Sequence, residues 1–261
     1  MNHDVHDRLL PADVLFIHGN LSSNAWWRPS FEAWRAEADE SFRGRAIAAE
    51  WKGCGKSEAP RDESELHPAR LADDYINLLR DLGVKRAHVV GHSTGGLIAL
   101  YAMAKAPELF DRAVLLDPVT DRGVAFGAEA IDAFAHMARS RDFCQTVMAN
   151  TIHGVDQANP FFQQLVDDAF GVAPTVWTGI PAVLKTLDAA GLVDRIKQTT
   201  LVLHGELDPV LPIEGSVDLA RRLKNGEFFE LKGCGHSTNV EDPELFVRLV
   251  DEHLFETDRE D

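Results

Sequence analysis

Short apolar runs alternate with longer amphipathic stretches along most of the chain. Nearly all of the six runs lack the polar alternation of a half-exposed strand, which is typical of parallel strands covered on both faces. These predicted strands read DVLFIHG, GRAIAAE, AHVVGHS, RAVLLDP, TTLVLHGE and EFFELKG. Between them the sequence predicts helices over Trp27–Ala38, Pro68–Leu82, Thr94–Ala106, Glu214–Lys224 and Pro243–Leu254. This alternation indicates βαβ crossovers, and therefore an α/β fold with a doubly wound, mostly parallel sheet.

Residues 119–196 interrupt the alternation. The segment contains no convincing strand, whereas stretches such as AIDAFAHMA and FFQQLVDDAF place their apolar residues on one helical face. It is also far longer than an ordinary connection between two elements. We therefore expect residues 119–196 to form an inserted helical cap, and residues 1–118 and 197–261 to form the α/β core.

Composition narrows the kind of partner. The 261 residues include 26 Lys and Arg against 42 Asp and Glu, which gives a formal net charge of −16. This balance argues against binding to nucleic acid or to an anionic membrane surface. Cys54, Cys144 and Cys234 show no paired spacing, so neither a disulfide framework nor a metal site is expected. No apolar segment has the length of a signal peptide core or a membrane span, which favours a cytoplasmic location. The oligomeric state stays open.

The stretch VVGHSTGGL, at Val89–Leu97, carries the most specific chemical signal. A strand that ends at Gly91 would turn sharply through Ser93 into the following helix. Gly91 and Gly95 would leave room for the crowded backbone around that turn. This is the G-x-S-x-G nucleophile elbow, which exposes a serine hydroxyl above the edge of the sheet.

Other strands deliver reactive residues to the same edge. In an open α/β sheet the site lies beyond the carboxyl ends of the strands. The first predicted strand is followed there by HGNLSSN, and later strands are followed by Asp117, Asp208 and His236. A serine, an acid and a histidine thus follow their strands in the chain order Ser93, Asp208, His236.

The motifs FIHGN, GHSTGG, LHGELD and GCGHS together resemble those of serine hydrolases of the α/β-hydrolase superfamily, from about Val14 to Leu254. Two features depart from the pattern. The dozen residues before the first predicted strand leave little room for the usual antiparallel hairpin, so we expect a shortened sheet. The turn EWKGCGKS carries Glu50 where the family often has aspartate. The same turn resembles a phosphate-binding loop, but Glu50 stands where that loop needs glycine.

The resemblance implies a role for each residue. His236 would take the proton of Ser93 and later return it to the leaving group. Asp208 would hold the imidazole and stabilise its charged form, with Asp117 as the alternative acid. The main-chain amides of Asn20 and Thr94 would form the oxyanion hole. We assign the remaining histidines near these motifs to structure, namely His18, His88, His92 and His204.

This chemistry fits hydrolysis of a small carboxylic ester or thioester through an acyl-serine intermediate, without a cofactor. Aromatic side chains that flank the site in sequence are candidate walls of the substrate pocket: Trp26, Phe126, Phe161 and Trp177. A lactonase or a C–C bond hydrolase would use the same triad, and a non-catalytic ligand receptor is the alternative outside enzymes. Dehalogenation is disfavoured, because serine would form a stable ether with an alkyl halide.

Overall fold

A seven-stranded sheet forms the centre of the computed structural model, which describes residues 1–37 and 42–255. The strand order is β1-β3-β2-β4-β5-β6-β7, and every neighbouring pair is parallel except the antiparallel pair β1 and β3. The strands are β1 (Asn2–Leu10), β2 (Val14–Ile17), β3 (Gly44–Glu50), β4 (Ala87–His92), β5 (Phe110–Leu116), β6 (Thr199–Gly205) and β7 (Gly226–Leu231). The six predicted strands are all present, and the α/β fold is confirmed.

The strand β1 is absent from the sequence prediction. Its residues, NHDVHDRLL, are mostly polar and half or fully exposed, so they lack the apolar run by which the other strands were recognised. It lies at the edge of the sheet, where its main chain pairs with β3 from Asn2 opposite Glu50 to Leu10 opposite Gly44. One antiparallel strand therefore precedes β2 in place of a hairpin. Polar side chains are suited to such an edge because they discourage further strand addition.

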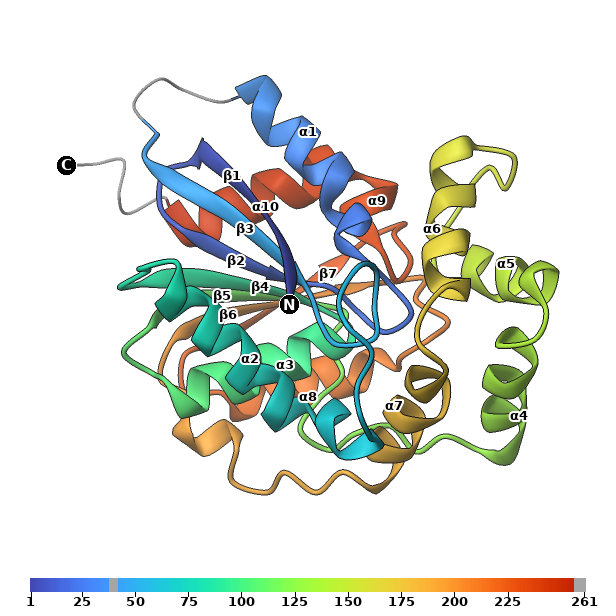
Figure 1. The fold of residues 1–261 in the computed structure, drawn as a ribbon. Helices are drawn as coiled ribbons and strands as arrows, with labels where there is room; N and C mark the ends of the chain where they lie inside the picture. The colour runs from blue at the N-terminus through green and yellow to red at the C-terminus, as the bar shows by residue number, and fades with distance from the viewer. Residues whose placement is uncertain (38–41, 256–261) are drawn as a thin grey trace.

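Helices cover both faces of the sheet (Figure 1). The helices α1 (Arg28–Glu37) and α10 (Pro243–Phe255) lie over one face, and α2 (Pro68–Asp81), α3 (Thr94–Lys105) and α8 (Ile213–Arg222) lie over the other. Each face buries its own apolar cluster. The predicted helices are found with ends shifted by at most two residues, and Ala38, the predicted end of the first, lies outside the described residues.

Residues 119–196 contain helices and no strand. The helices α4 (Ala128–Met137), α5 (Arg141–Ala149), α6 (Pro160–Phe170) and α7 (Pro174–Thr186) form a group beside the sheet layers (Figure 1). The short helix η3 (Val193–Arg195) contacts α3 and α8. We propose the division into an α/β core and a helical cap on this arrangement.

Glu50, the departure from the family pattern, organises the turn that follows β3. Its side chain is buried, and it accepts hydrogen bonds from the Lys56 main-chain N–H and the Asn2 side-chain amide, both at 2.7 Å. Gly55 has a positive φ of 51°, and a Cβ there would overlap the Glu50 carboxylate. The carboxylate thus occupies the centre of the loop, where a phosphate-binding loop would hold its anion.

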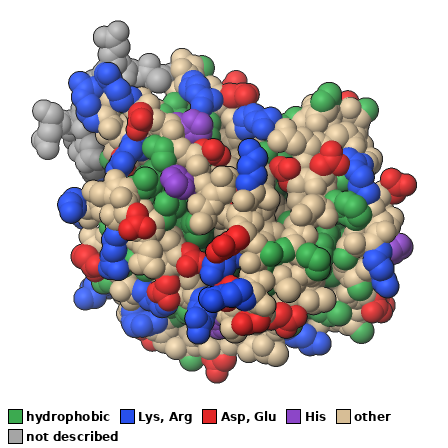
Figure 2. All heavy atoms as spheres, viewed as in Figure 1, with side chains coloured by type: hydrophobic (Ala, Val, Ile, Leu, Met, Phe, Trp, Pro, Cys, Tyr) green, Lys and Arg blue, Asp and Glu red, His purple; other side chains and the backbone are tan. Residues whose placement is uncertain are grey.

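Charged side chains of both signs lie side by side on the face shown in Figure 2. Ion pairs of the described residues include Arg45 with Asp13 at 2.7 Å and Arg222 with Asp121 at 2.6 Å. Among the described helices, none combines the length and the hydrophobicity needed to cross a bilayer.

The close approach of α3 to the strand ends makes a direct test of the fold. A Cβ on Gly95 would overlap the main-chain oxygen of Ile17, which cannot move without disturbing β2. We expect Gly95→Ala to lower the free energy of unfolding by about 2–3 kcal/mol or more, as overpacking does, measured by urea denaturation. Gly215→Ala on α8 is the matched control, because its Cβ would meet only the Thr120 methyl at 3.7 Å. That variant should be unchanged or more stable by up to about 1 kcal/mol, and equal losses in both would contradict the prediction.

Candidate active site

A cavity of about 590 Å³ lies between the carboxyl ends of the strands and the cap. Its floor comes from the loops that follow β2, β4, β6 and β7, and its roof comes from α4, α5 and the loop after α5. This is the size of pocket that encloses a small organic ligand. The cavity therefore occupies the position at which α/β sheets bind their substrates.

Ser93 lies on the floor at the sharp turn between β4 and α3. Its φ of 52° and ψ of −120° place it in a strained conformation that a residue with a side chain rarely adopts. Crowding by glycine backbone enforces the turn: a Cβ on Gly91 would lie 2.6 Å from the Gly95 carbonyl oxygen. The sequence expectation that these two glycines make room for the elbow is thus borne out by their contacts.

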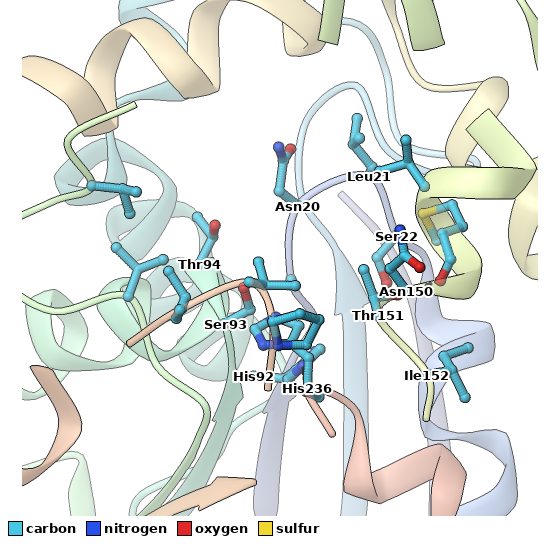
Figure 3. A pocket seen from close by; sticks show the side chains of 18 of the residues that line it. Asn20, Leu21, Ser22, His92, Ser93, Thr94, Asn150, Thr151, Ile152 and His236 are labelled. Atoms are coloured by element: carbon cyan, nitrogen blue, oxygen red, sulfur yellow. Dashed lines mark hydrogen bonds between the residues drawn. The ribbon is translucent and has the colours of Figure 1, made fainter. Parts of the chain in front are cut away.

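His236 and Asp208 meet beside the serine. His236 lines the cavity together with Ser93 (Figure 3), and its Nδ1 lies 2.7 Å from Oδ2 of Asp208. The Asp208 side chain is wholly buried, and its Oδ1 accepts hydrogen bonds from the main-chain N–H groups of Val210 and Leu211. Asp208 therefore pairs with His236, and His236 shares the floor of the cavity with Ser93.

The electrostatics of Asp208 suit an acid that stays ionised. Burial by itself would raise the pKa of the Asp208 carboxyl. The hydrogen bond and the charge of His236 act in the opposite direction and outweigh it, so the pKa lies below its ordinary value. An ionised Asp208 fixes the proton of His236 on Nδ1 and leaves Nε2 free to act as a base.

Asp117, the alternative acid, lies behind the triad. Its side chain is fully buried and does not line the cavity. Its Oδ1 accepts a hydrogen bond of 2.8 Å from the Gly205 main-chain N–H, whereas the carboxyl bonded to His236 is that of Asp208. Burial, followed by the negative charge of Asp208, raises the pKa of Asp117 well above its ordinary value.

The residues of the predicted oxyanion hole flank Ser93. Asn20 and Thr94 both line the cavity, on either side of the serine in Figure 3. Thr94 is the first residue of α3, where a main-chain N–H has no acceptor inside the helix. Gly19 brings the loop after β2 against the elbow, since a Cβ there would lie 3.1 Å from Cβ of Ser93.

Two of the four candidate aromatic residues line the cavity and two do not. Trp26 packs on the His92 ring with centroids 5.9 Å apart, and Phe126 lines the cap side. Phe161 instead lies beneath the Arg28 guanidinium, 5.3 Å from the ring centroid. Trp177 is buried in the core cluster, on a helix that packs against a short helix of the core (Glu63–Leu66). Proximity in sequence did not reveal the direction in which these two side chains point.

Several cavity residues were not predicted to belong to the site. His92, assigned to structure, lines the floor, and its Nε2 lies 2.8 Å from the His236 carbonyl oxygen. Burial, followed by the charge of His236, lowers the pKa of His92 to about 3, so the ring is neutral. Asn150, Thr151 and His153 line the opposite wall. These three residues belong to a segment without a recognisable motif, so the sequence could not predict them. His92 directly precedes Ser93 in the chain, and this position could have predicted that its side chain lies at the site.

Glu241 holds the loop that carries His236. Its carboxylate accepts hydrogen bonds from the main-chain N–H groups of Gly235 at 2.6 Å and Ser237 at 3.0 Å, on either side of the histidine. It accepts a third, at 2.9 Å, from the N–H of His153 in the cap. One carboxylate therefore fixes the histidine loop and joins it to the cap.

We expect Glu241→Ala to leave these three amides without their acceptor. Hydrogen bonds to a charged group contribute about 1.5–3 kcal/mol each, so the free energy of unfolding should fall by at least about 2 kcal/mol in a denaturant titration. Glu244→Ala, an exposed carboxylate in the first turn of α10, is the control and should cost less than about 1 kcal/mol. A Glu241→Ala variant as stable as the control would show that the loop does not depend on this residue.

Metal-ligating side chains also gather behind the triad. Donor atoms of His92, Asp117 and His236 lie within 4.8 Å of one another, as do those of Asp117, His204 and Asp208. His236 and Asp208 already bind each other, and both nitrogens of His204 contact Ser216 Oγ and the Leu211 carbonyl. We therefore assign these groups to the surroundings of the triad rather than to a metal.

The chain is similar to several proteins named as hydrolases and to a solved structure of the same fold. The chain is 29% identical to a 2-hydroxymuconate semialdehyde hydrolase of Pseudomonas putida, over 98% of this chain and 91% of that protein. It is 27% identical to a putative carbamate hydrolase of Agrobacterium fabrum, over 99% of this chain and 100% of that protein. Among solved structures, the enol-lactonase of Burkholderia xenovorans superposes with a TM-score of 0.83 at 20% identity, covering 98% of this chain and 96% of that one.

The family model described as the alpha/beta hydrolase family matches residues 14–249, from the start of β2 into α10. This span includes the elbow at Ser93, the acid after β6 and the histidine after β7. The chain belongs to the alpha/beta hydrolase family.

Proposed function

We propose that this hydrolase cleaves a neutral carboxylic ester through an acyl-serine intermediate. Ser93 is the nucleophile, His236 the general base and acid, and Asp208 the residue that orients His236. The observation that carries the proposal is the buried bond of 2.7 Å between His236 and Asp208, in the cavity whose floor carries the strained Ser93.

Acylation follows from this arrangement. His236 Nε2 accepts the hydroxyl proton as Ser93 Oγ attacks the ester carbonyl carbon, and Asp208 stabilises the imidazolium that forms. The carbonyl oxygen becomes an oxyanion, which the amides of Asn20 and Thr94 stabilise by hydrogen bonds. When the tetrahedral intermediate collapses, the C–O bond breaks, and the leaving alcohol takes the proton from His236.

Deacylation repeats these steps with water. His236 removes a proton from water as the oxygen attacks the acyl carbon, and the same amides hold the second oxyanion. Collapse returns the proton to Ser93 Oγ and releases the carboxylic acid. The ester bond is hydrolysed, and the enzyme returns to its starting state without a cofactor.

The lining of the cavity supports a neutral substrate. Apolar side chains dominate the cap side, among them Val124, Phe126, Phe134, Met137 and Leu184. Among the described residues that line the cavity, the basic side chains are histidines, and there is no Lys or Arg. A substrate carboxylate buried here would lack a permanent cationic partner, at a cost of several kcal/mol. This favours an ester or a lactone over a carboxylate such as the heptadienoate in the name of the 2-hydroxy-6-oxo-2,4-heptadienoate hydrolase of Pseudomonas putida, which is 26% identical.

The nucleophile is tested with Ser93→Ala. We expect kcat/KM for p-nitrophenyl esters to fall at least about 10³-fold, because loss of the attacking group leaves only the oxyanion hole and binding. A fluorophosphonate probe should label the wild type and not the variant. Ser22→Ala, in the same cavity, is the control and should keep its labelling. A wild type that binds ligand but is neither acylated nor active would instead support the receptor.

Charge selectivity is tested with two esters of equal length. We expect p-nitrophenyl hexanoate to exceed mono-p-nitrophenyl adipate in kcat/KM by roughly 10–100-fold, since the adipate carboxylate would be buried unpaired. Ala133→Arg places a guanidinium in the lining of α4 and should narrow this ratio, whereas Ala135→Arg, exposed on the same helix and outside the lining, should not. A wild type that prefers the adipate would contradict the neutral substrate.

A further inference from the structure

We propose that Asp117 is a second, protonated carboxyl that donates its hydrogen to Asp208 and so limits how tightly Asp208 holds the charged form of His236. The inference rests on the proposed function, because it concerns the same triad. It makes Asp117 a positioning residue, which acts on the reaction through Asp208 and touches neither substrate nor cavity.

Adjacent parallel strands bring the two carboxyls together. Asp117 follows β5 and Asp208 follows β6, and the main-chain N–H of Asp117 donates to the Leu203 carbonyl at 2.9 Å. Carboxylate oxygens of Asp117 and Asp208 lie within 4.8 Å of each other and of a His204 nitrogen. The pair is thus built into the sheet.

The hydrogen bonds of Asp117 are incomplete for an ionised group. Its Oδ1 accepts the Gly205 N–H, but its buried Oδ2 accepts nothing from any N–H or O–H group of the described residues. An ionised carboxylate with a bare, buried oxygen is costly, and two such charges side by side are more so. A proton on Asp117 removes both costs, because the carboxyl then donates to Asp208.

The charged groups around Asp117 also favour its protonated form. Asp117 experiences negative charge from Asp208 and, to a smaller extent, from Glu241. The facing histidines are His204, His92 and His236. Burial lowers the pKa of both His204 and His92, so these rings are neutral. His236 alone gains charge in the reaction, and Asp208 already pairs with it.

The main chain holds Asp117 in place at a cost. Its φ of 43° lies in the left-handed region, where a residue other than glycine is strained by about 1–2 kcal/mol. Aspartate tolerates this conformation better than most residues. The chain therefore holds a strained acid behind the triad, within 4.8 Å of Asp208.

A donor on Asp208 weakens its attraction for the imidazolium. The reaction needs the neutral imidazole, because that form accepts the proton of Ser93. Asp117→Leu removes the donor, so we expect the acidic limb of kcat/KM against pH to move upward by about 0.5–1 pH unit. Asp117→Asn keeps an N–H donor of similar shape, so the limb should stay where the wild type has it.

Two results would overturn the inference. One is an Asp117→Asn variant that loses activity as severely as Asp208→Asn, since Asp117 would then be the triad acid. The other is an Asp117→Leu variant with the acidic limb of the wild type, since Asp117 would then serve only packing.

Thermal unfolding gives a readout that needs no activity. A carboxyl whose folded pKa is raised costs stability as pH rises above its unfolded value near 3.8. The unfolding midpoint of Asp117→Asn minus that of the wild type should therefore increase from pH 4 upward. Asp208→Asn should behave oppositely. The pKa of Asp208 is lowered in the folded protein, so the unfolding midpoint of the wild type should exceed that of the variant at neutral pH, and the difference should disappear as pH falls.

This readout separates the two hypotheses. If Ser93→Ala is fully active, the proposed function fails, but the unfolding midpoints still test the protonation of Asp117. If the midpoint difference for Asp117→Asn does not increase with pH, Asp117 is not a protonated carboxyl, and the proposed function still stands on Ser93.

Discussion

The close contact between main-chain segments at the start of α3 is the constraint on which the site depends. Gly91, Gly95 and Gly96 let the helix lie against β4, the end of β2 and Pro118 with no side chain between them. Only this spacing allows the turn at Ser93 to rise from the sheet edge beside the loop that carries Asn20. The strain at Ser93 is supported by a buried sheet on both sides, which is how such conformations persist in folded proteins.

Around this turn the protein places His236 among several acids. His236 lies between Asp208, which binds its ring, and Glu241, which holds its main chain. The pKa values of Asp208 and Asp117 differ because their surroundings differ. Asp208 is stabilised as an anion by the histidine and by two main-chain amides, whereas burial beside that anion drives Asp117 toward its neutral form. Position in the sheet, rather than residue type, separates their roles.

The sequence predicts those parts of the structure that depend on short-range patterns. The buried strands, the elbow at Ser93 and the acid and histidine positions all follow from apolar runs and local motifs. The edge strand β1 escaped notice because hydrogen bonds to β3, not burial, hold it in place. The pocket walls could be predicted only in part. Trp177 and Phe126 are both aromatic residues of the segment 119–196, but Trp177 packs in the core and Phe126 lines the cavity. The proximity of Asp117 to Asp208 depends on the pairing of β5 with β6, which no local pattern specifies.

The shared carboxylate of Glu241 has a mechanical consequence. Because it binds the cap at His153 and the main chain on both sides of His236, that corner of the cap cannot lift away without loosening the loop that carries His236. An entrance that opened there would displace the proposed base each time a molecule entered. The hydrogen bonds of Glu241 do not involve α4, which forms another part of the roof, so a movement of α4 would leave the main chain around His236 in place.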